Sequence, residues 1–383
     1  MILESLSLIN FKNYDQAQLK FCSKFNCFVG NNGMGKTNLL DAIHYISFCK
    51  SFFNASDSQN IKYNQPFFAI QAWINKNNET HEIYCGVKRG HKKQFKHNKK
   101  EYERLSEHIG LYPLVMISPS DIELIWDGSE VRRKFMDSII SQYDKAYLEK
   151  LIAYNHVLQQ RNALLKQFYE SRSFDSMSLE VWDDQLILYG ESIIHTRVQF
   201  LNEFIPLFNK NYKFISGSNE DVSLDYESTL KDRSYKSVLL TSLDRDRAVH
   251  YTTTGPHRDD LEFKLMDNSL KKFASQGQQK SYLLALKLAQ FEFIKDKKLT
   301  KPLLLLDDIY DKLDETRFKK LIELVSNDTF GQVFITDTHP KRIKELFEQQ
   351  QAEHLTAAVQ VFKQQAEHLI YMVNNGEIDL YQN

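Results

Sequence analysis

The sequence predicts an α/β fold whose sheet carries a glycine-rich loop, with an α-helical lobe inserted into the chain. An apolar run over 25–29 precedes the loop, and apolar residues at helical spacing follow it. A second apolar run, 303–306, ends in two carboxylates. Residues 122–210 carry hydrophobic side chains three or four positions apart, which is the spacing of packed helices. We therefore expect an N-terminal part (1–121), the helical lobe (122–210) and a C-terminal part (211–383).

The glycine-rich loop fits the pattern G-x-x-x-x-G-K-[ST] without a mismatch. It consists of Gly30, Asn31, Asn32, Gly33, Met34, Gly35, Lys36 and Thr37. A strand before such a loop and a helix after it place successive backbone N–H groups around a phosphate. Lys36 can reach the β- and γ-phosphates as a catalytic group, and the Thr37 hydroxyl can bind Mg²⁺. The loop therefore predicts binding of ATP with Mg²⁺.

Composition narrows the class of protein without identifying a function. The 383 residues suffice for two or three domains, and the formal net charge of −1 means that any nucleic-acid contact must use a local patch. The four cysteines contain no C-x-x-C pair, which is typical of reduced thiols in a cytoplasmic protein. No signal-peptide pattern and no run of about 18 apolar residues is present, so neither secretion nor a membrane span is expected.

The first 29 residues alternate apolar and polar positions and predict a hairpin that leads into the strand before the loop. Lys12 and Asn13 fall at its turn, which would place them at a strand end near the nucleotide. A solvated hairpin tip is the alternative that the pattern leaves open.

The strongest basic patch spans 88–100, where seven of thirteen residues are lysine or arginine and none is acidic. A polyanion backbone is the natural partner of such a patch, and a lysine-rich hairpin tip in solvent is the alternative. The candidate contacts to nucleic acid are Lys92, Lys93, Lys96 and Lys99.

Arg132 and Arg133 lie near the start of the helical lobe, where they could contact a phosphate, but a solvated helix start is the expectation that we favour. Alternation returns at 212–215 and 249–253 and predicts two short strands. The string at 254–260, Thr-Gly-Pro-His-Arg-Asp-Asp, predicts a tight turn, and on residue types alone a salt-bridged corner accounts for it.

Two later segments supply the remaining chemistry. Ser275, Gly277 and Gln278 open an apolar helix, and a serine with a glycine amide at a helix N-terminus can bind a γ-phosphate. Asp307 and Asp308 end the second apolar run. Asp307 can hold Mg²⁺, in part through water, and Asp308 can polarise the attacking water as the catalytic base.

The C-terminal part holds further local features. Residues 311–314 predict a turn, and 332–335 predict another buried strand. The sequence Gln-Gln-Ala-Glu-His-Leu occurs at 350–355 and again at 364–369, and its simplest interpretation is a local duplication that lengthens a helix or loop. A final hairpin is expected at 374–376, which reads Asn-Asn-Gly.

The glycine-rich loop, the Ser-x-Gly-Gln signature and the Asp-Asp strand end together resemble an ATP-binding-cassette head of the SMC type. Further strings resemble the RecF family of bacterial recombinational-repair proteins. They are Phe11-Lys12-Asn13-Tyr14, Ser118-Pro119-Ser120-Asp121 followed by Arg132-Arg133, and Gly255-Pro256-His257-Arg258-Asp259-Asp260. The resemblance runs to about residue 340, and no sustained heptads predict the long coiled coil of SMC proteins.

The resemblance implies an ATPase head that closes as an ATP-bound homodimer. ATP would lie between the glycine-rich loop of one protomer and Ser275, Gly277 and Gln278 of the other, and slow hydrolysis would reopen the pair. The resemblance also implies binding to junctions of single-stranded and duplex DNA. RecF-like proteins act there with RecR and RecO to help RecA load in DNA repair and replication.

Several positions depart from the family pattern. Lys12 stands where arginine is usual, and Asp311 occupies a position that is commonly serine. Asp308 replaces the glutamate of transporter cassettes, although two adjacent aspartates are usual in RecF-like chains. Ser118 and residues 336–338 fall where a glutamine and a switch histidine are expected. We therefore expect weak hydrolysis.

Two other classes of protein stay open on the sequence. A transporter ATPase subunit shares the loop, the signature and the acidic strand end, but not the helical lobe or the strings at 11–14 and 255–260. An ATP-gated scaffold would bind ATP and its partners without needing turnover.

Overall fold

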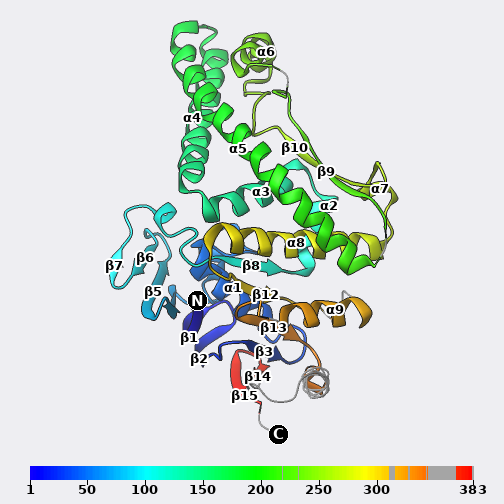
Figure 1. The fold of residues 1–383 in the computed structure, drawn as a ribbon. Helices are drawn as coiled ribbons and strands as arrows, with labels where there is room; N and C mark the ends of the chain where they lie inside the picture. The colour runs from blue at the N-terminus through cyan, green and yellow to red at the C-terminus, as the bar shows by residue number, and fades with distance from the viewer. Residues whose placement is uncertain are drawn as a thin grey trace. The chain divides into compact units, whose positions relative to one another are not determined.

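The computed structural model describes residues 1–217, 219–231, 233–309, 315–326, 328–341, 343 and 368–381. The chain divides into two compact units (Figure 1). The first unit comprises Met1–Ser120 with Ile294–Asn383, and the second unit comprises Asp121–Phe293. Within the described ranges, the first unit holds two six-stranded sheets and the second holds a three-stranded sheet.

One sheet of the first unit is antiparallel, with the strand order β2-β1-β4-β5-β6-β7. Its strands are β1 (Ile2–Phe11), β2 (Tyr14–Lys20), β4 (Phe67–Lys76), β5 (Glu79–Lys88), β6 (Gln94–His97) and β7 (Lys100–Glu101). Asn77 and Asn78 form the two-residue turn between β4 and β5 with positive φ, a conformation that asparagine tolerates. The pairing of β1 with β2 confirms the hairpin predicted at the start of the chain.

The other sheet is mixed, with the strand order β15-β14-β3-β13-β12-β8. Its strands are β3 (Phe25–Val29), β8 (Leu114–Ile117), β12 (Leu303–Leu306), β13 (Val333–Asp337), β14 (His368–Asn374) and β15 (Glu377–Leu380). All neighbouring strands are parallel except β14 and β15. The four leucines of β12 are buried between parallel neighbours, which explains their continuous apolar run. The carboxyl ends of β3, β12 and β13 lie at one edge of this sheet, where open α/β sheets bind ligands.

α1 (Lys36–Phe48) follows the glycine-rich loop and contributes to a hydrophobic core that it shares with both sheets. Phe11 of β1, Tyr45 of α1 and Phe68 of β4 pack edge to face in this core, with ring centroids 5.2 to 6.4 Å apart. The remaining short elements before the second unit are the 3-10 helices η1 (Asp57–Asn60), η2 (Leu105–Glu107) and η3 (Pro119–Ile122). α9 (Glu315–Ser326) lies between β12 and β13 in the chain. The core fixes the position of α1 and therefore of the loop that precedes it.

Helices dominate the second unit (Figure 1). They are α2 (Glu123–Trp126), α3 (Ser129–Tyr143), α4 (Lys145–Ser171), α5 (Ser176–Ser216), α6 (Tyr235–Val249), α7 (Leu270–Phe273) and α8 (Gln276–Lys298), which begins in this unit. The Asp144 and Asp175 carboxylates cap α4 and α5 by accepting hydrogen bonds from first-turn N–H groups. The sheet of this unit consists of β9 (Val222–Glu227), β10 (Asp260–Leu265) and β11 (Asn268–Ser269). Among the described helices, none combines the length and the apolar character that a membrane span requires.

The predicted boundary at residue 210 falls inside α5, and the second unit continues to Phe293. Phe204, Phe208 and Tyr212 are fully buried at a spacing of four, so the helix continues past the expected end of the lobe. The strand predicted at 212–215 is therefore wrong. The strand predicted at 249–253 is also wrong, because Val249 ends α6 and the residues after it form no strand.

The C-terminal predictions fare differently. The strand expected at 332–335 is confirmed as β13, and the hairpin expected at 374–376 is confirmed as the β14–β15 pair. The turn predicted at 311–314 lies outside the described residues. The first copy of the repeat also lies outside them, and the second is described only at His368 and Leu369, which begin β14.

Candidate functional site

The glycine-rich loop connects β3 to α1 in backbone conformations that glycine adopts readily. Gly30, Gly33 and Gly35 have φ values of 152°, 80° and 114°. A Cβ atom on Gly30 would lie 2.3 Å from the carbonyl oxygen of Val373 on β14, so no side chain fits there. Gly35 is the N-cap of α1. The loop therefore leaves the N-terminus of α1, with its partial positive charge, available to a phosphate.

Asn13 and Tyr14 brace this loop from the start of β2. The Asn13 amide donates to the Met34 carbonyl oxygen at 2.9 Å, and its own oxygen accepts from the Asn38 amide at 2.7 Å. The buried Tyr14 hydroxyl donates to the Gly35 carbonyl oxygen at 2.9 Å. Asn13 thus lies against the glycine-rich loop and contacts the loop backbone.

Lys12 instead forms an ion pair with Asp41, a buried residue of α1. Its ammonium lies 2.6 Å from Asp41 Oδ2, and the Asp41 side chain has no exposed surface. Asp41 also accepts hydrogen bonds from the Ser51 hydroxyl at 2.6 Å and the Phe52 N–H at 2.7 Å. A phosphate contact from Lys12 would have to compete with this buried carboxylate.

Lys36 lies inside the curve of the loop. Its ammonium donates to the carbonyl oxygens of Gly30 at 2.9 Å and Asn31 at 3.0 Å, and the residue is only 4% exposed. Both acceptors belong to the loop that would surround the β-phosphate. The ammonium is therefore placed to reach a bound triphosphate.

Thr37 and Asp307 come together from opposite ends of the chain. The hydroxyls of Thr37 and of Thr336 on β13 both donate to Asp307 Oδ1, each at 2.9 Å. Burial raises the pKa of Asp307 to about 6; the two hydroxyls oppose this effect and the charge of Asp308 adds to it. One hydroxyl and one carboxylate, completed by phosphate oxygens and water, suit Mg²⁺, which keeps several waters when bound. The described ranges contain no group of three or more His, Cys, Asp and Glu side chains that would hold another metal.

Asp308 follows in a left-handed backbone conformation, with φ of 43°. Its N–H donates to the Thr336 hydroxyl oxygen at 2.8 Å, and this contact supports the unusual backbone conformation. Its buried Oδ1 has no hydrogen-bond partner in the part of the chain that the structure describes. A buried carboxylate oxygen without a donor is an acceptor that a water molecule satisfies, so Asp308 is suited to polarise an attacking water.

Thr336 is a member of this site that sequence reasoning did not assign. β12 and β13 pair in parallel with Leu306 opposite Ile335, so Thr336 stands beside Asp307. The hydroxyl thereby contacts both the Asp307 carboxylate and the Asp308 backbone. Strand register is not visible in the sequence, but a threonine near the end of the next buried strand was an available signal.

The signature residues open α8 in the second unit. The Ser275 N–H donates to the Gln278 side-chain oxygen at 2.8 Å, and the Gln278 N–H donates back to the Ser275 hydroxyl at 3.3 Å. This reciprocal pair is a capping box, with glutamine as its fourth residue. The Gln278 amide also donates to Glu220 at 2.7 Å, which holds the segment in place. Ser275 is exposed and Gly277 is half-buried, so this helix N-terminus is open to an anion.

The four candidate lysines of the basic patch differ in their surroundings. Lys92 and Lys99 are exposed, and the half-buried Lys96 lies over the Tyr84 ring at 5.7 Å. Lys93 is held within the first unit, since its ammonium lies 2.8 Å from Asp57 Oδ2 and donates to the Cys49 carbonyl oxygen at 2.6 Å. Three of the four lysines are therefore available to a polyanion, whereas Lys93 already has a carboxylate partner.

The string at 254–260 forms the salt-bridged corner that its residue types predicted. Arg132 donates to both oxygens of Asp260, at 2.7 and 2.9 Å. The Arg133 guanidinium donates to the backbone oxygen of Asp259 at 2.6 Å. The expectation of a solvated helix start is therefore wrong for Arg132, whose side chain is only 13% exposed.

Known proteins resemble this chain along nearly its whole length. The family model described as the RecF/RecN/SMC N terminal domain matches residues 2–368. The DNA replication and repair protein RecF of Flavobacterium johnsoniae is 53% identical over 342 residues, which cover 89% of this chain and 95% of that protein. RecF of Bacteroides thetaiotaomicron is 50% identical over 380 residues, which cover 99% of this chain and 98% of that protein.

Solved structures resemble the fold as well. The structure of the recombination mediator protein RecF with ATP in the RecFOR pathway matches with a TM-score of 0.87 and 29% identity, covering 99% of this chain and 97% of that one. An SMC head bound to the C-terminal winged-helix domain of ScpA matches with a TM-score of 0.54 and 15% identity, covering 100% of this chain and 97% of that one, and speaks for the fold alone. These likenesses confirm the predicted ATPase head of the ABC/SMC type.

Proposed function

The chain belongs to the RecF family of DNA replication and repair proteins, and we propose that it closes on DNA as an ATP-bound homodimer in recombinational repair. The observation that carries this proposal is the meeting of Lys36, Thr37, Asp307 and Asp308 at one edge of the mixed sheet. In the proposal, Lys36 and the loop amides hold the phosphates of ATP, and Thr37 and Asp307 hold Mg²⁺. The metal neutralises phosphate charge when it is bound.

The dimer is proposed because the signature, at the N-terminus of α8, is a second and separate candidate for an anion site. Ser275, Gly277 and Gln278 would contact the γ-phosphate on the loop of a partner protomer, so each of two nucleotides would link both chains. A ligand that binds only the closed dimer shifts the population toward that state. ATP would thereby control the fraction of protein in the closed dimer, in which both protomers contribute to the DNA-binding surface.

The proposed DNA target is a junction of single-stranded and duplex DNA. Lys92, Lys96 and Lys99 supply positive charge on the first unit without a carboxylate partner in the described ranges. The resemblance to the RecF family supports action with RecR and RecO, and through them help for RecA loading. Such a role places the protein in the cytoplasm.

Hydrolysis is proposed to be slow and to serve dimer opening. Asp308 would polarise the attacking water, and Lys36 would stabilise charge on the phosphates. The Asp308→Asn variant separates this reading from an ATP-gated scaffold, because the substitution removes the base and keeps the shape of the side chain. Repair activity that survives the complete loss of hydrolysis would favour the scaffold.

The decisive experiment is analytical ultracentrifugation of the full chain with and without ATP·Mg²⁺, in the presence of labelled gapped DNA. We expect a monomer without ATP and a dimer that carries the DNA with ATP. The Lys36→Ala variant is the matched control and should stay monomeric. Dimers that ignore DNA would instead favour the ATP-gated scaffold.

A further inference from the structure

The second unit contains a cavity of about 370 Å³ between α3, α4, α5 and the loop 252–258. Its size is at the low end for small-ligand sites and accommodates a phosphate with the adjoining sugar. The polar lining is dominated by charge. Its charged residues are Glu130, Arg133, Lys134, Asp137, Arg197 and Arg258.

The two carboxylates of the cavity already have cationic partners. Glu130 lies 2.6 Å from the Lys134 ammonium, and Asp137 lies 2.9 Å from the Arg197 guanidinium. Of the four cations in the lining, two therefore remain. Arg133 and Arg258 form no ion pair with a carboxylate of the described residues. The cavity thus has an excess of two positive charges.

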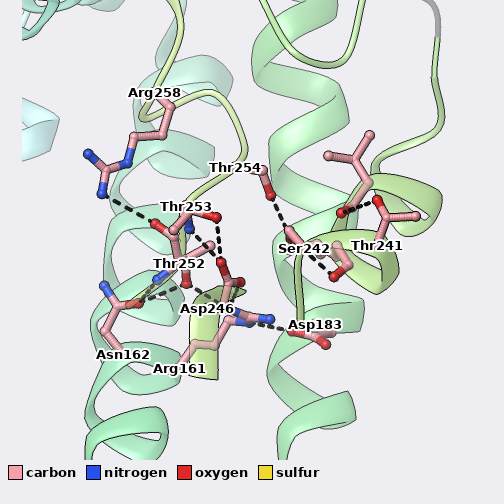
Figure 2. A network of polar contacts seen from close by, with 12 residues as sticks. Arg161, Asn162, Asp183, Thr241, Ser242, Asp246, Thr252, Thr253, Thr254 and Arg258 are labelled. Carbon is pink, nitrogen blue, oxygen red and sulfur yellow. Dashed lines mark hydrogen bonds and ion pairs between the residues drawn. The ribbon is translucent and has the colours of Figure 1, made fainter. Parts of the chain in front are cut away.

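The loop that carries Arg258 is anchored firmly at its base (Figure 2). The buried Asp246 carboxylate accepts hydrogen bonds from the N–H and the hydroxyl of Thr253, at 2.9 and 2.6 Å. Arg161, which has no exposed surface, pairs with Asp246 at 2.7 Å and donates to the Thr252 hydroxyl at 2.9 Å. This network fixes the backbone from which the loop enters the cavity.

Arg258 itself is held only lightly. It donates a long hydrogen bond of 3.4 Å to the Thr252 carbonyl oxygen (Figure 2). Its guanidinium lies 5.0 Å from the centre of the Tyr251 ring. The side chain is exposed. A guanidinium has five N–H donors, so most of those on Arg258 are available to a ligand.

Arg133 faces the same space from α3. Its Nη1 donates to the Ser129 hydroxyl and to the Asp259 carbonyl oxygen, both at 2.6 Å, which fixes the guanidinium while leaving its other nitrogens to the cavity. Burial is the main reason that the pKa of His257 falls to about 4, and the positive charges of Arg258 and Arg133 act in the same direction. His257 is therefore neutral, accepting from the Tyr154 hydroxyl at 2.7 Å, and the two arginines alone set the positive potential.

We propose that this cavity binds a phosphate group between Arg133 and Arg258. Planar guanidinium groups recognise phosphate oxygens through paired hydrogen bonds, and two of them without carboxylate partners match one phosphate charge. A DNA strand is the expected source, and this choice of source rests on the proposed function. Free phosphate is the other source of the same chemistry. Binding here requires neither ATP nor a dimer.

The test compares the full chain with its Arg258→Gln variant in DNA binding without ATP. Dissociation constants for a labelled gapped duplex are measured from about 50 to 300 mM salt. Loss of one phosphate contact should lower the slope of log affinity against log salt by about 0.7–0.9. Arg247→Gln is the matched control, because Arg247 lies on α6 of the same unit, stacks on Phe174 and lies 3.9 Å from Asp244. Its slope should not change.

A second arm identifies the source of the phosphate. Inorganic phosphate is titrated calorimetrically into the full chain and into Arg258→Gln. Phosphate binding that disappears in the variant, with an unchanged DNA slope, would support the cavity as a site for free phosphate. An unchanged slope together with no phosphate binding would overturn the proposal. Either result leaves ATP-dependent dimerisation, measured on the same samples, as a separate test of the proposed function.

Discussion

Asp307 is the residue on which the contacts of the nucleotide site converge. It is buried, it accepts hydroxyl hydrogen bonds from Thr37 and Thr336, and it precedes a second carboxylate. Burial raises its pKa to about 6 although the charge of Lys36 acts in the opposite direction, so the ionised side chain destabilises the protein when no metal is bound. Function and stability therefore oppose each other at this position.

Replacing Asp307 with asparagine should raise the thermal midpoint of the nucleotide-free protein at neutral pH. The folded-state pKa lies above the unfolded value, so the stabilising contribution of the protonated form is complete below about pH 4 and is lost as the pH rises through about 6. The neutral amide avoids this loss, a gain on the order of 1–3 kcal/mol at pH 7.5 that should shrink toward pH 5. Thermal unfolding across this pH range measures it.

The same variant should lose the stabilisation that wild type gains from ATP·Mg²⁺. A carboxylate ligand is replaced by a neutral amide, which binds Mg²⁺ poorly. Asp296→Asn is the matched control, since Asp296 is an exposed carboxylate near the end of α8. In the absence of nucleotide at pH 7.5, a thermal midpoint of Asp307→Asn below that of wild type would contradict the assignment of a destabilising buried charge.

At this scale the sequence located the residues whose roles depend on neighbours in the chain. Lys36 and Thr37 belong to one loop, and the two aspartates directly follow one strand. Lys93 differs from the other three candidate lysines because it contacts Asp57 and the Cys49 carbonyl oxygen, which are more than 30 positions away in the chain. Local charge counts cannot separate a lysine paired with a distant carboxylate from one in solvent.

At the scale of elements, the β1–β2 hairpin acts as a support for the glycine-rich loop. Asn13 and Tyr14 at the start of β2 contact the carbonyl oxygens of Met34 and Gly35. The β14–β15 hairpin contacts the loop as well, since the Gly376 N–H donates to the Met34 carbonyl oxygen at 3.3 Å. The loop is thus held in shape by two hairpins, one that precedes it in the chain and one that follows it.

The Asn13→Ala variant should weaken ATP binding more than it weakens the fold. The substitution removes two side-chain hydrogen bonds to the loop region, each worth about 0.5–1.5 kcal/mol, and the cost falls on loop order. We expect ATP affinity to fall about 5- to 150-fold in calorimetric titration. Asn268→Ala, at an exposed asparagine that bonds the Met266 carbonyl oxygen, is the control. Unchanged affinity in Asn13→Ala would show that the loop holds its shape without this brace.

The basic patch at 88–100 provides a second prediction at the scale of elements. Replacing Lys92, Lys96 and Lys99 together with alanine should lower the salt slope of DNA binding by about 0.7–0.9 for each lost phosphate contact. The Lys93→Ala variant is the internal control, because it removes an ion pair with Asp57. It should lower the thermal midpoint and leave the slope intact. The opposite pattern would assign DNA contact to Lys93 and solvent to the other three lysines.

The elements that the sequence misplaced lie in the second unit. α5 continues through 212–215, where four residues in isolation fit a strand, because its buried face is set by Phe204 two turns earlier and Phe208 one turn earlier. The strands of the first unit were easier to predict, since β12 is a continuous apolar run and the β1–β2 hairpin alternates along its length. The spacing of apolar residues predicted a helix or a strand correctly only where the segment was long enough to show that spacing several times.

At the scale of the whole molecule, the nucleotide site needs both ends of the chain. β12 and β13 come after the second unit in sequence, yet they lie between β8 and β3 in the mixed sheet. Asp307 therefore meets Thr37 only after the chain has passed through the second unit. The loop, Asp307 and Asp308 belong to the first unit, whereas Ser275 belongs to the second.

The last prediction tests whether the two anion sites act between protomers. Lys36→Ala should prevent ATP binding by the glycine-rich loop. Ser275→Arg should block the signature of its own chain and leave ATP binding by its loop intact. Each variant alone should stay monomeric with ATP·Mg²⁺. Mixed in equal amounts, they can form a heterodimer in which an intact loop on one chain faces an intact signature on the other.

We therefore expect sedimentation of the mixture with ATP·Mg²⁺ to reveal dimers that neither variant forms alone. One composite site replaces two, so the mixture is examined at concentrations about tenfold above those at which wild type dimerises. Lys36→Ala alone, at the total protein concentration of the mixture, is the control. A mixture that stays monomeric beside a dimeric wild type would contradict a nucleotide shared between chains, and it would return the signature to a role within its own protomer.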